Sequence, residues 1–366
     1  MRLLFIAFEL DEDSAVLAWQ GRVANALAAH CEQVVAVAEK VGRYEPADNV
    51  EVHALPGRPW GIPRKLGSAV LLNPWFYRLC RRRRIDACFI HMAAPWAYRL
   101  APAFRLLDLP TLVWYAHGSV NRALRWVHRC ADRIVTSTPE GFRLPSNKCH
   151  VIGQGIDTKL FVLTRPAGMQ NHTLVYSGRL SSRKRIELLI ETLALLRGEH
   201  ALPITLRLIG GVITSADQAY LAELKADVQR RQLGPYVRFD GHIPMSTMPA
   251  VYNDAFLHIN VSQTNSMDKT VLESLACGCP VLTSNEAFPG LLNDAGYPQF
   301  ILADDSPPAI AQRVAELYRT QDQYAPEAMR ALIVGHHDLD SYAGKIITQL
   351  GAIRRGSATK VARIAE

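Results

Sequence analysis

Two cations stand where a short apolar stretch gives way to an amphipathic segment in the second half of the chain. Thr173–Tyr176 has the composition of a buried strand, and Gly178 permits a tight turn from it into a helix. Arg179 and Lys184 fall on that turn and on the first helical turn, as loop cations without an evident buried partner. Because cations at a helix N-terminus oppose the helix dipole, their placement favours an anion between them. The spacing therefore predicts an anion site.

A second stretch, 255–284, predicts a strand, a polar loop, a helix and another strand. The apolar run Phe256–Val261 precedes the loop Ser262–Asp268, and Gly278 stands where the helix would end in a left-handed residue. The start of a helix leaves backbone N–H groups unpaired and attracts phosphate. In this stretch those groups belong to Lys269, Thr270 and Val271.

The segment 272–284, LESLACGCPVLTS, resembles the donor-site segment of family 4 of the retaining, nucleotide-sugar-dependent glycosyltransferases. The resemblance implies the GT-B architecture, an α/β fold of two Rossmann-like, doubly wound parallel-sheet domains facing across a cleft. It also implies a hexosyltransferase-like enzyme, as in polysaccharide biosynthesis. Such an enzyme moves a sugar from a nucleoside diphosphate carrier to a glycan, lipid-linked or small-molecule acceptor, with retention at the anomeric carbon.

In that family, two glutamates eight positions apart bracket the loop before this helix. Glu273 matches the second glutamate, which binds the ribose hydroxyls, although taken alone it fits an exposed helical carboxylate equally well. Asn265 replaces the first glutamate, which contacts the donor sugar. The usual loop glycines are replaced by Ser266 and Asp268, which fall on the same donor-sugar side.

The resemblance extends to other positions along the chain. Arg179 and Lys184 match the arginine and lysine that neutralise the donor diphosphate, at the turn that Gly178 opens. His117, just after the predicted strand Thr111–Tyr115, matches a histidine near the donor sugar, although a lone histidine is often structural. Backbone groups that read the base correspond to Gly241, His242 and Ile243.

The resemblance also predicts how the chain divides. GlyGlnGlyIleAsp at 153–157 is similar to the family's hinge signature, and a Pro- and Gly-containing linker follows it. We expect an acceptor-side Rossmann-like domain at 1–162, joined by a C-terminal helix at about 338–366. The nucleotide-sugar-binding domain would then span 163–337.

The first half opens with a β-loop-α-β pattern, which is typical of a Rossmann-like domain. The predicted strand Leu3–Phe8 precedes a helix at Ala15–Ala29 and a strand at Val34–Ala38. The loop Glu9–Ser14 contains no glycine, and its carboxylates would repel phosphate. We expect an Asp or Ser of this loop to cap the following helix.

Composition limits the classes of function. The chain has 366 residues, 49% of them hydrophobic, which suits two globular domains. Residues 1–150 hold 20 Lys and Arg against 13 Asp and Glu, so the excess positive charge lies in the first half. The seven cysteines form no CxxC pair, and neither a disulfide framework nor a zinc site is indicated.

One basic segment raises the question of a membrane. Residues 56–85 interleave Trp, Phe, Tyr and Leu with arginines, ending in the run Arg81–Arg84. This pattern fits either a helix on an anionic membrane surface or a crossover helix with a solvated basic end. No nucleic-acid-binding motif accompanies it. No signal peptide or membrane span is evident, so we expect a cytoplasmic protein, peripheral at the inner face of the plasma membrane if it binds lipid.

Two rival functions follow from the same residues. The loss of the first glutamate and the presence of Asp268 would also suit a catalytically inactive GT-B protein that binds a sugar nucleotide. A nicotinamide-dependent dehydrogenase would need a GxGxxG loop after a first strand, and neither half has one. In the favoured reading the two cations and the helix start stabilise the leaving diphosphate, so we expect no metal and no other cofactor.

Overall fold

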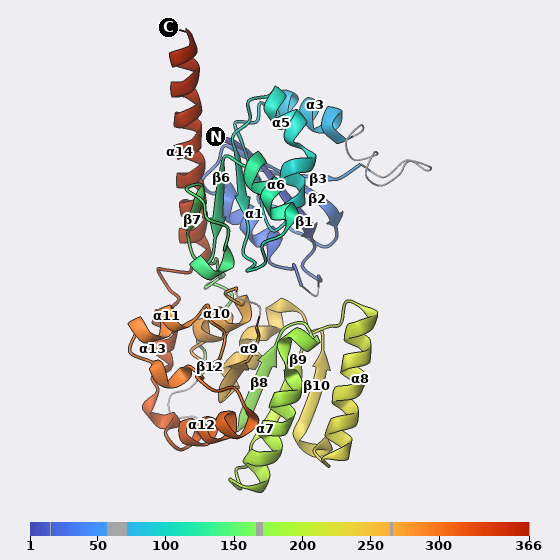
Figure 1. Ribbon diagram of the computed structural model, residues 1–366, viewed down its shortest axis with the longest axis vertical. Helices are drawn as coiled ribbons and strands as arrows, with labels where there is room; N and C mark the ends of the chain where they lie inside the picture. Colours follow the sequence, from blue (N-terminus) through green and yellow to red (C-terminus); the bar gives the residue numbers. More distant parts are fainter. Residues whose placement is uncertain (15, 57–71, 166–170, 264–265, 366) are drawn as a thin grey trace. The chain divides into compact units, whose positions relative to one another are not determined.

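The computed structural model describes the chain with the exception of residues 15, 57–71, 166–170, 264–265 and 366. It forms two compact units, which are described separately (Figure 1). Unit 1 comprises Met1–Gly155 and Leu339–Glu366, and unit 2 comprises Ile156–Asp338. The boundary falls at Gly155, whereas the sequence places it at residue 162.

Unit 1 is built on a parallel sheet of seven strands in the described part of the chain, with the order β3-β2-β1-β4-β5-β6-β7. The order reverses direction between β1 and β4, as in a doubly wound Rossmann sheet. The strands are β1 (Arg2–Leu10), β2 (Gln33–Val41), β3 (Val50–Ala54), β4 (Ala87–Ile90), β5 (Thr111–Trp114), β6 (Arg133–Thr136) and β7 (Cys149–Val151).

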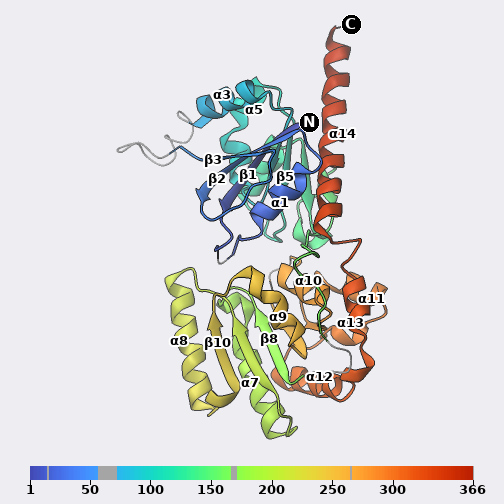
Figure 2. The same ribbon diagram turned by 180° about the vertical axis from the view of Figure 1, so that it is seen from behind.

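The side chains of these strands alternate between two buried layers, so both faces of the sheet are covered. In β2, for example, Val34 and Ala36 enter one layer, and Val35 and Val37 enter the other. The first layer is closed by α1 (Gln20–Ala28) and α14 (Leu339–Ala365), which lie side by side in Figures 1 and 2. The second is closed by α3 (Asn73–Arg83), α4 (Pro95–Arg99), α5 (Ala101–Leu106) and α6 (Arg122–Cys130).

Unit 2 repeats this plan with a parallel five-stranded sheet in its described residues, ordered β10-β9-β8-β11-β12. Its strands are β8 (Thr173–Ser177), β9 (Thr205–Ile209), β10 (Val237–Gly241), β11 (Leu257–Asn260) and β12 (Val281–Thr283). Its helices are α7 (Ile186–Gly198), α8 (Ser215–Arg230), α9 (Met248–Asn253), α10 (Lys269–Ala276), α11 (Pro289–Asp294), α12 (Pro307–Arg319) and α13 (Pro326–Ala331). The order of this sheet reverses between β8 and β11.

The predicted strands and helices occur with two differences. The first helix begins only at Gln20, and no side chain caps it, so the expected Asp or Ser cap is wrong. The Ser14 hydroxyl instead accepts from the Leu17 N–H at 3.1 Å in a turn that precedes the helix. The sequence also predicts a last strand near Phe300–Leu302, but the structure has only an isolated bridge there, between Ile301 and Thr283. The helix end at Gly278 is confirmed, since its φ of +77° lies in the left-handed region that glycine favours.

Candidate functional site

The reversal between β8 and β11 brings the loops after these two strands together at the carboxyl edge of the unit 2 sheet, where doubly wound folds bind ligands. The backbones are close there. Gly178 and Gly210 have φ values of +144° and +148°, and a Cβ on Gly210 would lie 1.7 Å from the carbonyl oxygen of Gly178. Only glycine fits at position 210. The amide of Gly210 donates to the carbonyl of Gly241 at 2.8 Å, so the loop after β9 is hydrogen-bonded to the end of β10.

Arg179 extends along this edge to the start of α8. Its Nε and Nη2 atoms donate to Oδ2 of Asp217 at 2.9 and 2.7 Å. Asp217 also forms a capping box with Thr214 at the helix N-terminus. Burial alone would raise the pKa of Asp217, but the N–H groups of Thr214 and Ile213 and the Arg179 guanidinium outweigh it and lower the pKa to about 2. The carboxylate is therefore a fixed anchor for the arginine.

Lys184 points into the loop that follows β11. Its Nζ donates to Oδ2 of Asp268 at 2.8 Å, and the same oxygen accepts from Asn260 Nδ2 at 2.9 Å and from Ser262 Oγ at 2.6 Å. Burial raises the pKa of Asp268, while the Lys184 ammonium and these hydrogen bonds lower it by more, so the pKa lies below its ordinary value. The cation, the carboxylate and two neutral donors form one cluster.

These contacts correct one expectation. The sequence presents Arg179 and Lys184 as loop cations without an evident buried partner, and this is wrong because each is paired with a carboxylate, Asp217 or Asp268. The partners lie 38 and 84 positions further along the chain. Both cations do lie at the edge where the sequence predicts an anion site.

The start of α10 is partly as expected. The helix begins at Lys269, but the amide of Val271 donates to the carbonyl oxygen of Asp268 at 3.2 Å, so the expectation of an unpaired N–H is wrong for Val271. Thr270 is half-buried in this first turn. Ser266 in the preceding loop accepts a hydrogen bond from Asn285 Nδ2 at 3.0 Å through its carbonyl. Asn265 lies outside the described residues.

Glu273 is not an exposed helical carboxylate, since only 8% of the residue is accessible to solvent. Burial raises the pKa of Glu273 to about 7, and the ammonium of Lys269, one turn earlier on α10, offsets only part of that effect. Burial likewise lowers the pKa of Lys269. Charged forms are costly in such an environment, and strongly shifted carboxyl groups cluster at functional sites.

The remaining predicted positions are distributed over both units. Gly241 has a φ of +69°, His242 is exposed, and Ile243 is half-buried against the unit 2 core. His117 is exposed on the loop after β5 in unit 1. Its Nδ1 accepts from the backbone N–H of Ser119 at 3.2 Å, so the proton of the neutral ring is on Nε2. His117 thus presents an N–H donor to solvent.

Sequence reasoning missed several polar residues of this edge. Asn260, Ser262 and Asn285 are each at most 2% exposed, yet the first two sit at the end of an apolar run, and that interruption is the signal that could have revealed them. Deeper in the sheet, Ser177 Oγ lies 2.8 Å from the Tyr252 hydroxyl and 3.2 Å from His258 Nε2. Burial lowers the pKa of His258 to about 3, so this histidine is neutral and supports the fold.

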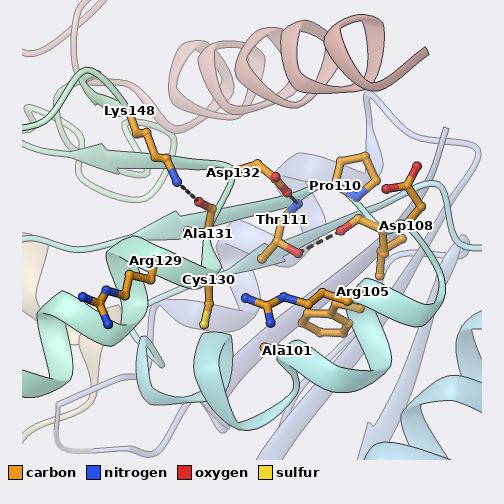
Figure 3. Close-up of a pocket in the computed structure, with 12 residues that line it drawn as sticks. Ala101, Arg105, Asp108, Pro110, Thr111, Arg129, Cys130, Ala131, Asp132 and Lys148 are labelled. Carbon is orange, nitrogen blue, oxygen red and sulfur yellow. Dashed lines mark hydrogen bonds between the residues drawn. The ribbon is translucent and has the colours of Figure 1, made fainter. Parts of the chain in front are cut away.

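A separate pocket of about 180 Å³ lies in unit 1 between α5, α6 and the residues that precede β5 and β6 (Figure 3). It is at the amino edge of the sheet, opposite the edge at which Rossmann-like folds bind ligands. Two of its charged side chains form hydrogen bonds with backbone groups of the pocket wall. Lys148 Nζ donates to the carbonyl of Ala131 at 3.1 Å, and Asp132 accepts from the Thr111 amide at 2.8 Å. Its lining includes Arg105 and Arg129.

No group of three or more His, Cys, Asp and Glu side chains among the described residues is arranged to hold a metal ion. In the same part of the chain, no helix has the length and apolarity needed to cross a membrane.

Comparison with known proteins identifies the chain. Residues 21–160 match the family model described as Glycosyltransferase Family 4, and residues 171–320 match the model described as Glycosyl transferases group 1. The chain is a glycosyltransferase with the GT-B fold. The resemblance read from LESLACGCPVLTS is thereby confirmed.

This glycosyltransferase is similar to two curated relatives and to one solved structure. It is 25% identical to a GDP-mannose-dependent alpha-mannosyltransferase from Mycolicibacterium smegmatis over 77% of this chain and 76% of that protein. It is 28% identical to a D-inositol 3-phosphate glycosyltransferase from Jonesia denitrificans, in a match that spans 38% of this chain and only 35% of that relative. HepE from Anabaena, solved with UDP and glucose, superimposes with a TM-score of 0.75 at 16% identity, covering 96% of this chain and 100% of that one.

Proposed function

We propose that this glycosyltransferase is a retaining enzyme that transfers a hexose from a nucleoside diphosphate sugar to a glycan, lipid-linked or small-molecule acceptor. The proposal is supported above all by the convergence of Arg179, Lys184 and the start of α10 at the switch point of the unit 2 sheet. Negative charge builds on the leaving diphosphate as the glycosidic bond breaks. Cations and helix N–H groups fixed in advance stabilise that charge.

The other residues take roles that follow from the family pattern. Glu273 would accept hydrogen bonds from the ribose hydroxyls, and backbone groups at 241–243 would contact the base. His117, Asn265, Ser266 and Asp268 would lie on the donor-sugar side. We propose that the diphosphate is neutralised by protein groups, without a metal ion.

Binding of bare nucleotides tests the donor site first. A nucleoside diphosphate present at a hundredfold excess over its Kd should raise the free energy of unfolding by about 2.7 kcal/mol. The measurement is a thermal-shift panel of UDP, GDP and ADP, with the matching nucleosides as controls that lack the diphosphate. GDP occurs in the name of the Mycolicibacterium relative, and UDP is bound in the HepE structure. A flat response to all three diphosphates would contradict the assignment, and binding without transfer would favour an inactive sugar-nucleotide-binding protein.

We also propose that unit 1 binds an anionic membrane surface. The sequence of residues 56–85 fits this role and a crossover helix alike, and residues 57–71 lie outside the described part of the chain. Residues 73–130 carry ten Arg and two Asp, with no Lys or Glu. All ten arginines are exposed, and they lie on the helices α3, α4, α5 and α6 or just after α3, which cover one face of the unit 1 sheet. We call this set the arginine face: Arg78, Arg81, Arg82, Arg83, Arg84, Arg99, Arg105, Arg122, Arg125 and Arg129. Leu106 and Trp126 are 78% and 54% exposed on the same helices, and such apolar groups suit an interfacial surface.

Vesicle co-sedimentation tests the arginine face. Replacing Arg122, Arg125 and Arg129 by Gln should weaken binding to phosphatidylserine-containing vesicles by roughly 3 kcal/mol, at about 1 kcal/mol per charge near the surface. Binding of the wild type should also fall with salt. The matched control removes three exposed charges from unit 2, at Arg183, Arg230 and Arg319. Equal loss in both triple variants, or no binding by the wild type, would reject the face.

A further inference from the structure

The carboxylate of Asp268 occupies an unusual position for a residue that precedes a helix. An Asp at a helix N-cap usually accepts hydrogen bonds from the first backbone N–H groups. Asp268 makes no such capping bond to α10. Its Oδ2 instead contacts the ammonium of Lys184, which belongs to the loop after β8. The carboxylate therefore spans the two loops that form the candidate diphosphate site.

Two further donors hold the same oxygen of this carboxylate in place. Asn260 Nδ2 and Ser262 Oγ donate to the same oxygen, and both residues are at most 1% exposed. These donors are neutral, so they orient the carboxylate without cancelling its charge. Lys184 provides the positive charge, and the side chains of Lys184 and Asp268 are each 15% exposed. A charge pair this far from solvent interacts more strongly than a surface pair.

A diphosphate that bound at this edge would meet two opposite effects. The start of α10 and Lys184 attract it. Asp268 repels it and already occupies the ammonium that it needs. The two anions cannot both pair fully with a single lysine, so binding must loosen the contact between Asp268 and Lys184.

We propose that Asp268 is an internal counter-ion of Lys184 that the donor diphosphate must displace, and that it thereby sets the affinity of the site for diphosphates. This inference rests on the proposed function. In the free protein the counter-ion keeps the lysine oriented. In the product complex it competes with the nucleoside diphosphate for the same ammonium and favours release.

The test compares the wild type with Asp268→Asn, which keeps the shape and hydrogen-bonding oxygen of the side chain but removes its charge. Calorimetric titration with UDP, GDP and inorganic pyrophosphate should show binding about tenfold tighter in the variant, equivalent to about 1.4 kcal/mol. Uridine and guanosine, which lack the diphosphate, should bind both proteins equally. Asp227→Asn is the matched control, because it removes a carboxylate from an ion pair with Arg231 on α8. It should leave all these affinities unchanged.

Several outcomes would overturn the inference. Unchanged or weaker diphosphate binding by a folded Asp268→Asn protein would show that Asp268 does not compete for Lys184. If Asp268→Asn does not give a cooperative thermal transition, Asp268→Ser replaces it, since serine is neutral and suits a position before a helix. Titrations with EDTA and with Mg²⁺ check a different role: a Mg²⁺-dependent gain in the wild type that is lost in the variant would make Asp268 a metal ligand and overturn the proposal.

Titration with pyrophosphate tests the counter-ion role of Asp268 independently of the donor-site assignment. If no nucleoside diphosphate binds either protein, the donor-site assignment fails. A gain in pyrophosphate affinity on Asp268→Asn would still support the counter-ion role. If nucleotides bind both proteins equally and pyrophosphate gains nothing, the donor site stands and the counter-ion role fails.

Discussion

Replacing Lys184 or Arg179 by alanine is expected to cut sugar transfer roughly a hundredfold. In the proposed donor site, each change removes a positively charged side chain that stabilises the leaving diphosphate. A preorganised contact of this kind contributes about 3 kcal/mol to the barrier. The measurement is the steady-state rate of transfer and of donor hydrolysis with each variant. The effect should appear mainly in kcat, since the charge grows in the transition state.

The same variants should also lose some stability, because both cations have carboxylate partners. Arg179→Ala leaves Asp217 with the backbone N–H groups of Ile213 and Thr214, so the loss should be about 1 kcal/mol. Lys184→Ala leaves Asp268 with two neutral donors. Thermal unfolding separates this loss from the loss of catalysis.

Arg183→Ala is the matched control for these variants. Arg183 lies next to Lys184 in the same short 3₁₀ turn and is exposed. Its removal changes the net charge of the loop by the same amount and should leave transfer unchanged. Equal losses in Arg183→Ala and Lys184→Ala would indicate a general charge effect, and normal turnover in both Arg179→Ala and Lys184→Ala would end the diphosphate assignment.

Much of the local structure could be predicted from the sequence because it depends on near neighbours. The sequence after His117 predicts a helix at Arg122–Cys130, and α6 has these bounds. It begins where Asn121 Oδ1 accepts from the Leu124 amide at 2.9 Å. The order strand, loop, helix, strand at 255–284 follows from apolar runs and from Gly278. In these cases the signals lie within a few residues of the feature that they specify.

The pairing of the cations could not be predicted, because it depends on the fold. Arg179 reaches Asp217 only because β9 lies beside β8 and delivers the start of α8 to the same edge. Lys184 reaches Asp268 only because β11 is the other neighbour of β8. Parallel neighbours are joined by crossovers, so residues far apart in sequence share one edge.

The environment of Glu273 is visible only in the structure. Glu273 fits an exposed carboxylate and a ribose ligand equally well on helical spacing alone. Its low exposure and raised pKa exclude the first of these. A buried carboxylate beside a predicted nucleotide site lowers stability unless it has a ligand to bind, and such a loss of stability is common at functional sites.

Glu273→Gln is therefore expected to weaken binding of nucleoside diphosphates by a factor of roughly ten to a hundred. Hydrogen bonds to a charged acceptor contribute about 1.5–3 kcal/mol, and the amide replaces a carboxylate that can accept from both ribose hydroxyls. Titration of the wild type and variant with UDP and GDP measures the loss. Glu223→Gln is the control, because Glu223 is an exposed carboxylate on α8, and it should have no effect.

Folding stability and nucleotide affinity of the wild type should depend on pH in opposite directions. Burial raises the pKa of Glu273 to about 7, above its ordinary value of 4.5. The contribution of this group to folding stability is therefore complete below pH 4.5 and is lost as the pH rises through about 7. In the proposed ribose contact the acceptor is the ionised carboxylate, so nucleotide affinity should change in the opposite direction and increase as the pH rises through the same value. In Glu273→Gln this part of the pH dependence should disappear.

A deoxynucleotide makes the assignment specific to the ribose. If Glu273 accepts from the ribose hydroxyls, the wild type should bind UDP or GDP more tightly than the corresponding 2′-deoxynucleotide, and Glu273→Gln should lose most of that preference. The substitution removes the acceptor, and the 2′-deoxynucleotide lacks one of the donors, so both changes disrupt the same hydrogen bond. Their effects on binding free energy therefore do not add. If the preference for ribose is undiminished in Glu273→Gln, the carboxylate acts elsewhere in the site and the match of Glu273 to the ribose-binding glutamate is incorrect.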